Sequence, residues 1–200
     1  MSGLDEKEIH RDPIRQFQIW LDDAIAANIP LAEAMTLATA TPDGRPAARM
    51  VLLKQVDQNG FVFFTNYRSA KARQLDANPY AAVVFYWNLL ERQVRVEGSV
   101  VRTSAEESRE YFQTRPRESQ IGAWASKQSE ELASRDELEQ RVAAAERKFA
   151  GAPVPRPPFW SGFRLTPERI EFWSGRTGRL HHRELFERQG TDWRTSLRYP

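Results

Sequence analysis

The first regular pattern in the chain is a helix that begins at Asp12-Pro13. Aspartate is a favoured helix cap, and proline suits the first helical position. Apolar residues then recur at helical spacing and form one face, which predicts an amphipathic helix. These apolar residues are Phe17, Trp20, Leu21, Ala24 and Ile25.

Beyond this helix the apolar positions form short runs separated by turns. The turn sequences at residues 42–44 and 57–60 contain Asp-Gly and Asn-Gly, which favour tight connections between strands. Such short turns indicate an antiparallel arrangement. The strands predicted in the first half lie at residues 35–41, 47–56, 61–65, 80–87 and 91–103.

Three serines mark the starts of further helices. Ser104 and Ser134 each precede a glutamate by three positions, which is the capping-box pattern, and Ser69 can cap a short helix. The predicted helices after Ser69, Ser104 and Ser134 end near Leu75, Thr114 and Phe149, and another short helix is expected at residues 117–124.

The last part of the chain returns to strand patterns. The predicted strands lie at residues 162–166, 169–173, after Leu180, and at 193–198. Seven or eight short strands with inserted helices favour a closed antiparallel barrel with helices outside it over a doubly wound parallel sheet. The predicted fold class is therefore mainly β with peripheral helices.

Composition restricts the possible kinds of site. The 200 residues suit one domain, with residues 1–11 as a flexible N-terminal arm, and the absence of cysteine excludes disulfides and thiolate chemistry. The net charge of +2 argues against a nucleic-acid binder. The longest apolar run, residues 81–87, is far shorter than the ~20 residues of a membrane span. No secretory signal, membrane or metal site is expected, and the predicted location is cytoplasmic.

Four segments carry more polar chemistry than a strand or helix needs. They combine arginine and lysine with hydroxyl and amide side chains, which together suit the binding of phosphate. Taken singly, each has an ordinary structural explanation, but their joint occurrence indicates a site that holds two phosphates. The segments are residues 49–54, 63–71, 111–129 and 171–183.

In this order, the segments resemble the pyridoxine (pyridoxamine) 5′-phosphate oxidase family. The resemblance runs from about Asp12 to Pro200 and is carried by RMVLLK, FFTN, LERQVRVEG, RPRESQIGAWASKQS, PPFWSGFRL, IEFWSGRTGRLHHR and the terminal LRYP. It implies a split β-barrel that binds flavin mononucleotide (FMN) and works as a homodimer with FMN at the subunit interface.

The resemblance also implies site residues. The FMN-binding set would be Arg49, Met50, Val51, Leu52, Leu53, Lys54, Phe64, Thr65, Lys71, Gln93, Gln128, Ser129, Trp173 and Arg183, some of them from the partner subunit. The substrate-binding set would be Lys54, Tyr111, Arg115, Ser119, Arg179 and His181. Within these sets, Lys71 would bind the flavin phosphate and Gln93 the flavin ring system.

The implied reaction is the oxidation of pyridoxamine 5′-phosphate and pyridoxine 5′-phosphate to pyridoxal 5′-phosphate by O2, releasing H2O2 and, from the amine, NH3. No side chain can accept the hydride that leaves the substrate C4′ carbon, so a flavin must supply that chemistry at its N5 atom. Arg179 and His181 would orient the pyridine ring and stabilise charge on it as the catalytic residues.

The chain departs from the family pattern in three places. Ala70 stands where many members have arginine, and Arg68 is the candidate to compensate for it. Phe64 replaces a commoner tyrosine, and only a short segment precedes the first helix.

Two other functions compete with this interpretation. One is an oxidase of the same fold that acts on another substrate, such as the flavin oxidases of phenazine biosynthesis. The other is a carrier or sensor that binds flavin or pyridoxal phosphate without turnover. The joint presence of Lys54, Tyr111, Arg115 and Ser119 favours the vitamin substrate over the phenazine-type oxidase. The sequence alone does not separate the carrier or sensor from a slow enzyme, and release of H2O2 on adding pyridoxamine phosphate would separate them.

Overall fold

A single antiparallel sheet forms the centre of the protein. The structure is a computed structural model that describes residues 9–200, so most of the predicted N-terminal arm lies outside the described residues. The sheet runs in the order β2-β1-β5-β6-β7-β4-β3, and β8 pairs with both β7 and β9. The strands are β1 (Ala34–Ala40), β2 (Pro46–Leu52), β3 (Gln55–Asp57), β4 (Gly60–Asn66), β5 (Tyr80–Trp87), β6 (Arg92–Arg102), β7 (Trp160–Ser174), β8 (His182–Gln189) and β9 (Asp192–Leu197).

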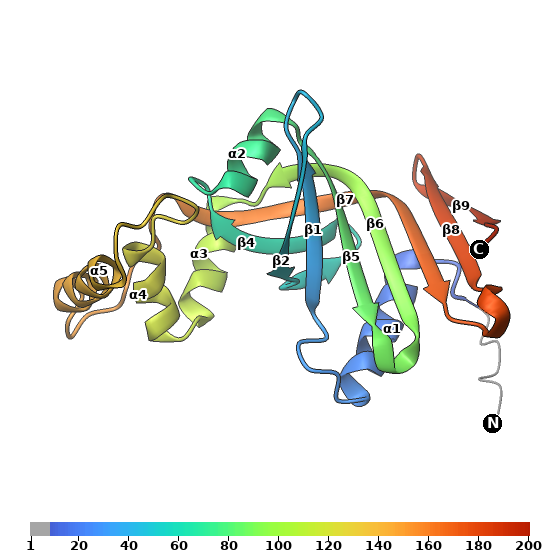
Figure 1. Cartoon of the computed structure of the whole chain (residues 1–200), viewed down its shortest axis with the longest axis horizontal. Coiled ribbons are helices and arrows are strands. Elements are labelled where there is room, and N and C mark those ends of the chain that lie inside the picture. Colours follow the sequence, from blue (N-terminus) through green and yellow to red (C-terminus); the bar gives the residue numbers. More distant parts are fainter. Residues whose placement is uncertain (1–8) are drawn as a thin grey trace.

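Helices surround this sheet, which confirms the predicted mainly β class with peripheral helices. Helices α3, α4 and α5 gather at one end of the molecule, whereas β8 and β9 lie at the opposite end (Figure 1). The helices are α1 (Pro13–Ala26), α2 (Ala70–Ala77), α3 (Ala105–Thr114), α4 (Arg117–Ala125) and α5 (Arg135–Lys148), with short 3-10 helices η1 (Asn88–Leu90) and η2 (Thr177–Arg179). Among residues 9–200, no helix has both the length and the apolar character needed to cross a membrane.

The predicted helix caps are confirmed. The Asp12 carboxylate accepts hydrogen bonds from the first backbone N–H groups of α1, and the hydroxyls of Ser69, Ser104 and Ser134 do the same for α2, α3 and α5. The glutamate of the first capping box has another partner, because Glu107 accepts a bond from Arg164 of β7 at 2.8 Å.

The predicted strand over residues 47–56 divides into β2 and β3 at Leu53-Lys54. The Leu53 N–H donates to the carbonyl of Glu33, next to β1, whereas the Lys54 N–H donates to the carbonyl of Val62 in β4. Two consecutive residues therefore contact opposite ends of the strand order. This step curls the sheet into a half-barrel. Among the described strands, β2 and β3 at the two ends of the order do not pair with each other, so the sheet is not the closed barrel that the strand pattern favoured.

The strands predicted at residues 162–166 and 169–173 are one continuous strand, β7. Proline has no N–H to donate, so a sheet tolerates it mainly at an edge or a bulge. Pro167 lies opposite Gly98, where the register between β6 and β7 shifts. A Cβ atom on Gly98 would lie 2.0 Å from the Thr166 carbonyl oxygen, so glycine permits this close approach.

Aromatic side chains fill the curled sheet. Phe17 of α1 is fully buried, and its ring centroid lies 4.8 Å from the rings of both Phe61 in β4 and Phe85 in β5. Since β6 and β7 separate these strands in the sheet, α1 packs across the curl. A second apolar cluster joins α3, α4 and α5 to the start of β7 through Phe112, Ile121 and Trp160.

Candidate functional site

A cleft of about 680 Å³ lies between the sheet and the helices α2, α3 and α4. Most of the site residues predicted from the first three polar segments line it. These residues are Arg49, Met50, Val51, Leu52, Lys54, Phe64, Thr65, Lys71, Tyr111, Arg115, Ser119 and Gln128. Leu53 does not line the cleft, because its side chain is buried in the main core.

The charge of this cleft is one-sided. Arg49, Lys54, Lys71 and Arg115 line it, and no aspartate or glutamate is among its lining residues. Arginine and lysine bind phosphate and carboxylate groups through charge-assisted hydrogen bonds. The cleft is therefore suited to an anionic ligand.

Lys71 is the most buried of these cations. Its ammonium group donates to the Thr65 hydroxyl and to the Gln128 side-chain oxygen, both at 3.2 Å. Burial lowers the pKa of Lys71 below its ordinary value, and the nearby positive charge of Arg49 lowers it further. An anion bound beside this ammonium group would offset both the burial of its charge and the repulsion from Arg49.

Arg49 is held in place from the neighbouring strand and from α2. Its guanidinium donates to the Thr39 hydroxyl at 2.6 Å and to the Gln74 side-chain oxygen at 3.1 Å. These partners are neutral, so they orient the guanidinium without neutralising its charge. Burial lowers the pKa of Arg49.

Arg115 ends α3 and lies against aromatic rings. Its guanidinium carbon is 4.6 Å from the centroid of the Trp160 ring, and its Nη1 atom is buried without a hydrogen-bond partner among residues 9–200. Burial lowers the pKa of Arg115. A buried donor left unpaired costs free energy, so this group is prepared for a ligand that accepts a hydrogen bond.

Three stacked rings form one wall of the cleft. The Phe64 ring lies 4.1 Å from that of Tyr111 and 5.3 Å from that of Trp160, with interplanar angles of 19° and 6°. Phe64 therefore acts here through its ring. Burial raises the pKa of Tyr111, so its hydroxyl stays protonated and able to donate a hydrogen bond.

Some lining residues were not predicted. Trp160 contacts both Arg115 and the ring stack, although the family resemblance includes it only as part of the PPFWSGFRL motif and gives it no role. The FFTN motif contains Asn66, which could have been singled out as a polar residue at the end of a strand. The unpredicted lining residues are Asn66, Thr114, Pro116, Gly122, Ala123, Ser126 and Trp160.

Arg68 does not replace the cation missing at Ala70 in this structure. Its guanidinium carbon lies 4.6 Å from the centroid of the Phe159 ring, and Arg68 is not among the residues that line the cleft. Stacking on this ring directs the side chain elsewhere.

The other predicted site residues lie apart from the cleft. Gln93 of β6 pairs with Trp173 of β7, which pairs with Arg183 of β8. The ring of His181 is 4.6 Å from that of Trp173, and a hollow of about 410 Å³ beside them is lined by His181 and Arg183. Arg179 lies exposed in η2, and Ser129 follows Gln128 but does not line the cleft.

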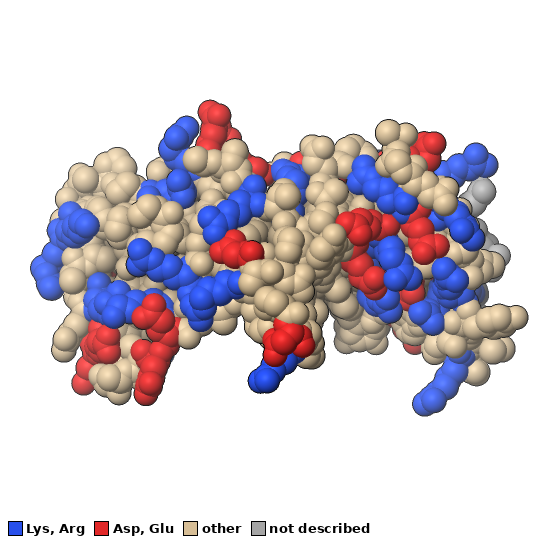
Figure 2. All heavy atoms as spheres, turned by 90° about the horizontal axis from the view of Figure 1, so that it is seen from above, with Lys and Arg blue, Asp and Glu red and all other residues tan. Residues whose placement is uncertain are grey.

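The predicted residues thus form two groups within one chain. The cleft group lies next to α3 and α4, and the second group lies near β8, at the other end of the molecule (Figure 1). The surface between them carries both signs of charge: on the face in Figure 2, acidic side chains interrupt the basic ones.

Comparison with protein families matches nearly the whole chain. The model described as pyridoxamine 5′-phosphate oxidase matches residues 21–149. The model described as the pyridoxine 5′-phosphate oxidase C-terminal dimerisation region matches residues 160–200.

Curated relatives agree with these matches. A pyridoxine/pyridoxamine 5′-phosphate oxidase from Rubrobacter xylanophilus is 61% identical over 193 residues, covering 96% of this chain and 89% of that protein. The protein of the same name from Thermosynechococcus vestitus is 57% identical over 195 residues, covering 98% of this chain and 92% of that protein.

Solved structures share the fold. PhzG from Burkholderia lata, solved with tetrahydrophenazine-1-carboxylic acid, has a TM-score of 0.93 and 32% identity, covering 100% of this chain and 98% of that chain. A pyridoxamine 5′-phosphate oxidase-related, FMN binding protein from Nostoc punctiforme has a TM-score of 0.75 and 20% identity, covering 92% and 97%, which shows the fold alone. From the family matches and the curated relatives together, this chain belongs to the pyridoxamine 5′-phosphate oxidase family.

Proposed function

We propose that this protein is an FMN-dependent oxidase that converts pyridoxamine 5′-phosphate and pyridoxine 5′-phosphate to pyridoxal 5′-phosphate. The observation that carries the proposal is the cleft, which has four cations, no carboxylate in its lining and an unpaired buried nitrogen on Arg115. A substrate and a cofactor that each bring a phosphate match this excess of positive charge. The curated relatives carry the name of this activity.

The residues around Lys71 fit the phosphate of FMN. Lys71 and Arg49 supply charge, and the Thr65 hydroxyl and Gln128 amide supply hydrogen bonds at the same place. The start of α2 adds backbone N–H groups of the kind that favour anions. When bound, FMN supplies the hydride acceptor and the reaction with O2 that forms H2O2.

The residues around Arg115 fit the phosphate of the substrate. Lys54, Tyr111 and Ser119 line the cleft together with Arg115, so two cations and two hydroxyls are available to one phosphate dianion. Arg115 is already desolvated against Trp160, which strengthens its attraction for an anion. The ring stack of Phe64, Tyr111 and Trp160 limits the directions from which a ligand can enter.

The second group of residues would complete the site from the partner subunit. Gln93, Trp173, Arg179, His181 and Arg183 lie away from the cleft of their own chain, and the family match over residues 160–200 is a dimerisation region. In a two-fold dimer each subunit can contribute this group to the cleft of the other. Arg179 and His181 would orient the pyridine ring over the flavin and stabilise charge on it, and Ser129 would join the FMN contacts.

Residues 1–200 would form one FMN-binding domain, which is supported by the single sheet that the nine strands within residues 9–200 share. A reducing, cytoplasmic location would fit the absence of cysteine.

The visible spectrum of the purified protein tests the proposal. A bound flavin should bleach when pyridoxamine 5′-phosphate is added without O2, and should recover in air with release of aldehyde, NH3 and H2O2. Unphosphorylated pyridoxamine is the matched control and should bleach the flavin only at much higher concentration. A protein that binds no flavin, or a flavin that never bleaches, would contradict the proposed oxidase.

The similarity to PhzG supports a second candidate, an oxidase of a reduced phenazine precursor. The matched experiment adds a dihydro- or tetrahydrophenazine carboxylate in place of the vitamin phosphate. Bleaching by the phenazine alone would favour this candidate. Bleaching by the phosphate alone would exclude it.

A further inference from the structure

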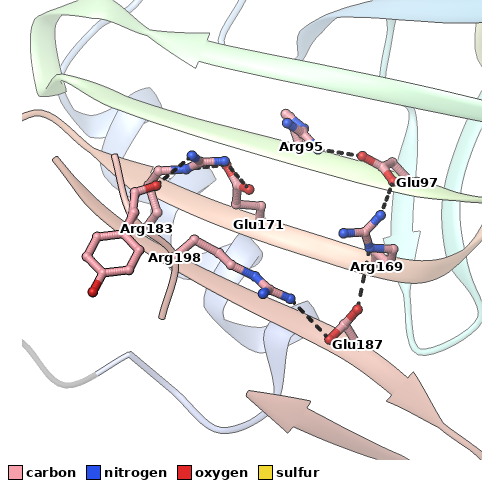
Figure 3. Close-up of polar contacts among 8 residues, drawn as sticks. Arg95, Glu97, Arg169, Glu171, Arg183, Glu187 and Arg198 are labelled. Carbon is pink, nitrogen blue, oxygen red and sulfur yellow. Dashed lines mark hydrogen bonds and ion pairs between the residues drawn. The ribbon is translucent and has the colours of Figure 1, made fainter. Parts of the chain in front are cut away.

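Arg183 is held by a buried carboxylate. Its Nε atom donates to Oε1 of Glu171 at 3.2 Å, and its Nη2 atom donates to Oε2 of the same residue at 2.9 Å (Figure 3). The Glu171 side chain is only 6% exposed, whereas that of Arg183 is 27% exposed. A two-point pair of this kind fixes the plane of the guanidinium.

The end of the chain supplies a third contact. The Nη1 atom of Arg183 donates to the backbone carbonyl of Tyr199 at 2.9 Å, and the N–H of Arg198 donates to the carbonyl of Arg183. An arginine has five N–H donors, so these contacts leave two, one on each Nη atom. Arg183 also lines the hollow beside His181, where those donors can meet a ligand.

Other ion pairs on the same sheet are more exposed than the pair of Arg183 and Glu171. Figure 3 shows a row of contacts that joins Arg95, Glu97, Arg169, Glu187 and Arg198 across β6 to the end of β9. The side chains in this row are between 32% and 47% exposed, so each pair contributes little. The carboxylate of Glu171 is the buried one, and its partner is a residue proposed to bind FMN.

We infer that Glu171 is a positioning residue for FMN, which holds the Arg183 guanidinium with two N–H groups free for the cofactor, and that the Tyr199 carbonyl assists it. This inference rests on the proposed function, since it assumes that Arg183 reaches FMN in the dimer. Glu171 itself would act only through Arg183. An unrestrained arginine at this position would lose side-chain entropy on binding, which weakens the complex.

The test is the affinity of the flavin-free dimer for FMN, measured by quenching of flavin fluorescence. Glu171→Gln keeps the size of the side chain but removes the two-point pair, and should raise the Kd for FMN roughly tenfold. Glu97→Gln makes the same chemical change on β6, where the carboxylate pairs with Arg95 and Arg169, and should leave the Kd unchanged. Thermal unfolding and sedimentation of each variant show whether the fold and the dimer persist.

A double-mutant cycle separates positioning from a general structural effect. Arg183→Ala should weaken FMN binding, and adding Glu171→Gln to it should cause no further loss. Additive losses, or an unchanged Kd in Glu171→Gln, would overturn the inference. If Glu171→Gln fails to fold, Glu171→Asp decides, because the shorter carboxylate keeps the charge but cannot hold both Arg183 nitrogens in the same place. An unchanged Kd would then overturn the inference, and a raised Kd would support it.

The same measurements distinguish a failure of the proposed function from a failure of the positioning role. Wild-type protein that binds no FMN would overturn the proposed function and this inference with it. If the wild-type protein binds FMN and both Arg183→Ala and Glu171→Gln bind it with the same Kd, the positioning role is overturned and the proposed function is not.

Discussion

The Arg115 side chain has an unsatisfied hydrogen-bond donor that a ligand could pair. Its Nη1 atom is buried and unpaired among the described residues, and the surrounding contacts are aromatic rings. Stability of the flavin-free protein would improve without this group, because an unpaired buried donor costs about 1–3 kcal/mol. Such a cost is typical of residues kept for binding.

Arg115→Ala should therefore affect the substrate and spare the cofactor. Loss of a charge-assisted contact worth roughly 1.5–3 kcal/mol should raise KM for pyridoxamine 5′-phosphate by at least about tenfold. The flavin content should stay unchanged. Steady-state kinetics give the KM for pyridoxamine 5′-phosphate and for unphosphorylated pyridoxamine, and only the first KM should rise. Loss of flavin with an unchanged KM would refute the assignment.

Lys71 also lowers the stability of the flavin-free protein, and the size of this cost depends on pH. Burial lowers its pKa below the ordinary value of 10.5, so the charged group costs stability at neutral pH. Between the lowered pKa and 10.5 the unfolded chain binds more protons than the folded one. Stability of the flavin-free protein, as far as it depends on Lys71, therefore rises with pH across that window.

Lys71→Met should stabilise the flavin-free protein and weaken FMN binding. At pH 7 we expect Tm to rise by about 2–4 °C for roughly 1 kcal/mol, and this gain should shrink as pH approaches 10.5. Thermal unfolding across a pH series and an FMN titration provide the two measurements. Lys54→Met, at an exposed position, is the stability control; a lower Tm for Lys71→Met at pH 7 would contradict the argument.

At the scale of elements, α3 determines where the substrate-binding residues of its last turns lie. Ser108 is fully buried on this helix, and its hydroxyl contacts those of Thr103 at 2.8 Å and of Ser161 in β7. Arg115 follows seven residues later as the C-cap residue of the same helix. The hydroxyl contacts therefore set the position of Arg115 relative to Trp160.

Ser108→Ala should change both stability and substrate binding. Losing the buried hydrogen bond between Ser108 and Ser161 should cost about 0.5–1.5 kcal/mol, and the resulting shift of α3 should raise KM several-fold. Ser104→Ala is the matched control on the same helix, because it removes an exposed cap worth about 1 kcal/mol and should leave KM unchanged. A destabilised Ser108→Ala with normal KM would show that the contact only supports the fold.

At the scale of the whole molecule, the two groups of predicted site residues lie toward opposite ends of a single chain. The cleft group adjoins α3 and α4, and the second group belongs to β6, β7, η2 and β8 (Figure 1). A two-fold dimer brings such groups together in pairs, giving two equivalent composite sites.

Mixing two variants that are each impaired at low substrate concentration, in different groups of site residues, tests this arrangement. Arg115→Ala damages the cleft and His181→Ala damages the second group, so a mixed dimer would contain one intact site and one doubly damaged site. After subunit exchange, activity should recover to about a quarter of the wild-type value. Each variant exchanged with itself is the control, and no recovery after demonstrated exchange would show that each site belongs to one chain.

Local chemistry determined much of what the sequence predicted about this protein. The helix starts at Asp12, Ser69, Ser104 and Ser134 depend on residues within three positions, and the structure confirms all four. The strand pattern likewise predicted the mainly antiparallel fold class. The family resemblance predicted most of the residues that line the cleft, since it rests on ordered motifs.

Only the tertiary structure decided the features that depend on distant partners. The continuity of β7 through Pro167 requires Gly98 opposite it, and the break after Leu52 arises because Leu53 and Lys54 bond to opposite ends of the sheet. The separation of Trp173 and Arg183 from the cleft follows from strand pairing, as does the burial of Glu171 beneath Arg183. These features involve contacts between residues far apart in the chain, whereas periodicity and capping report only on neighbours.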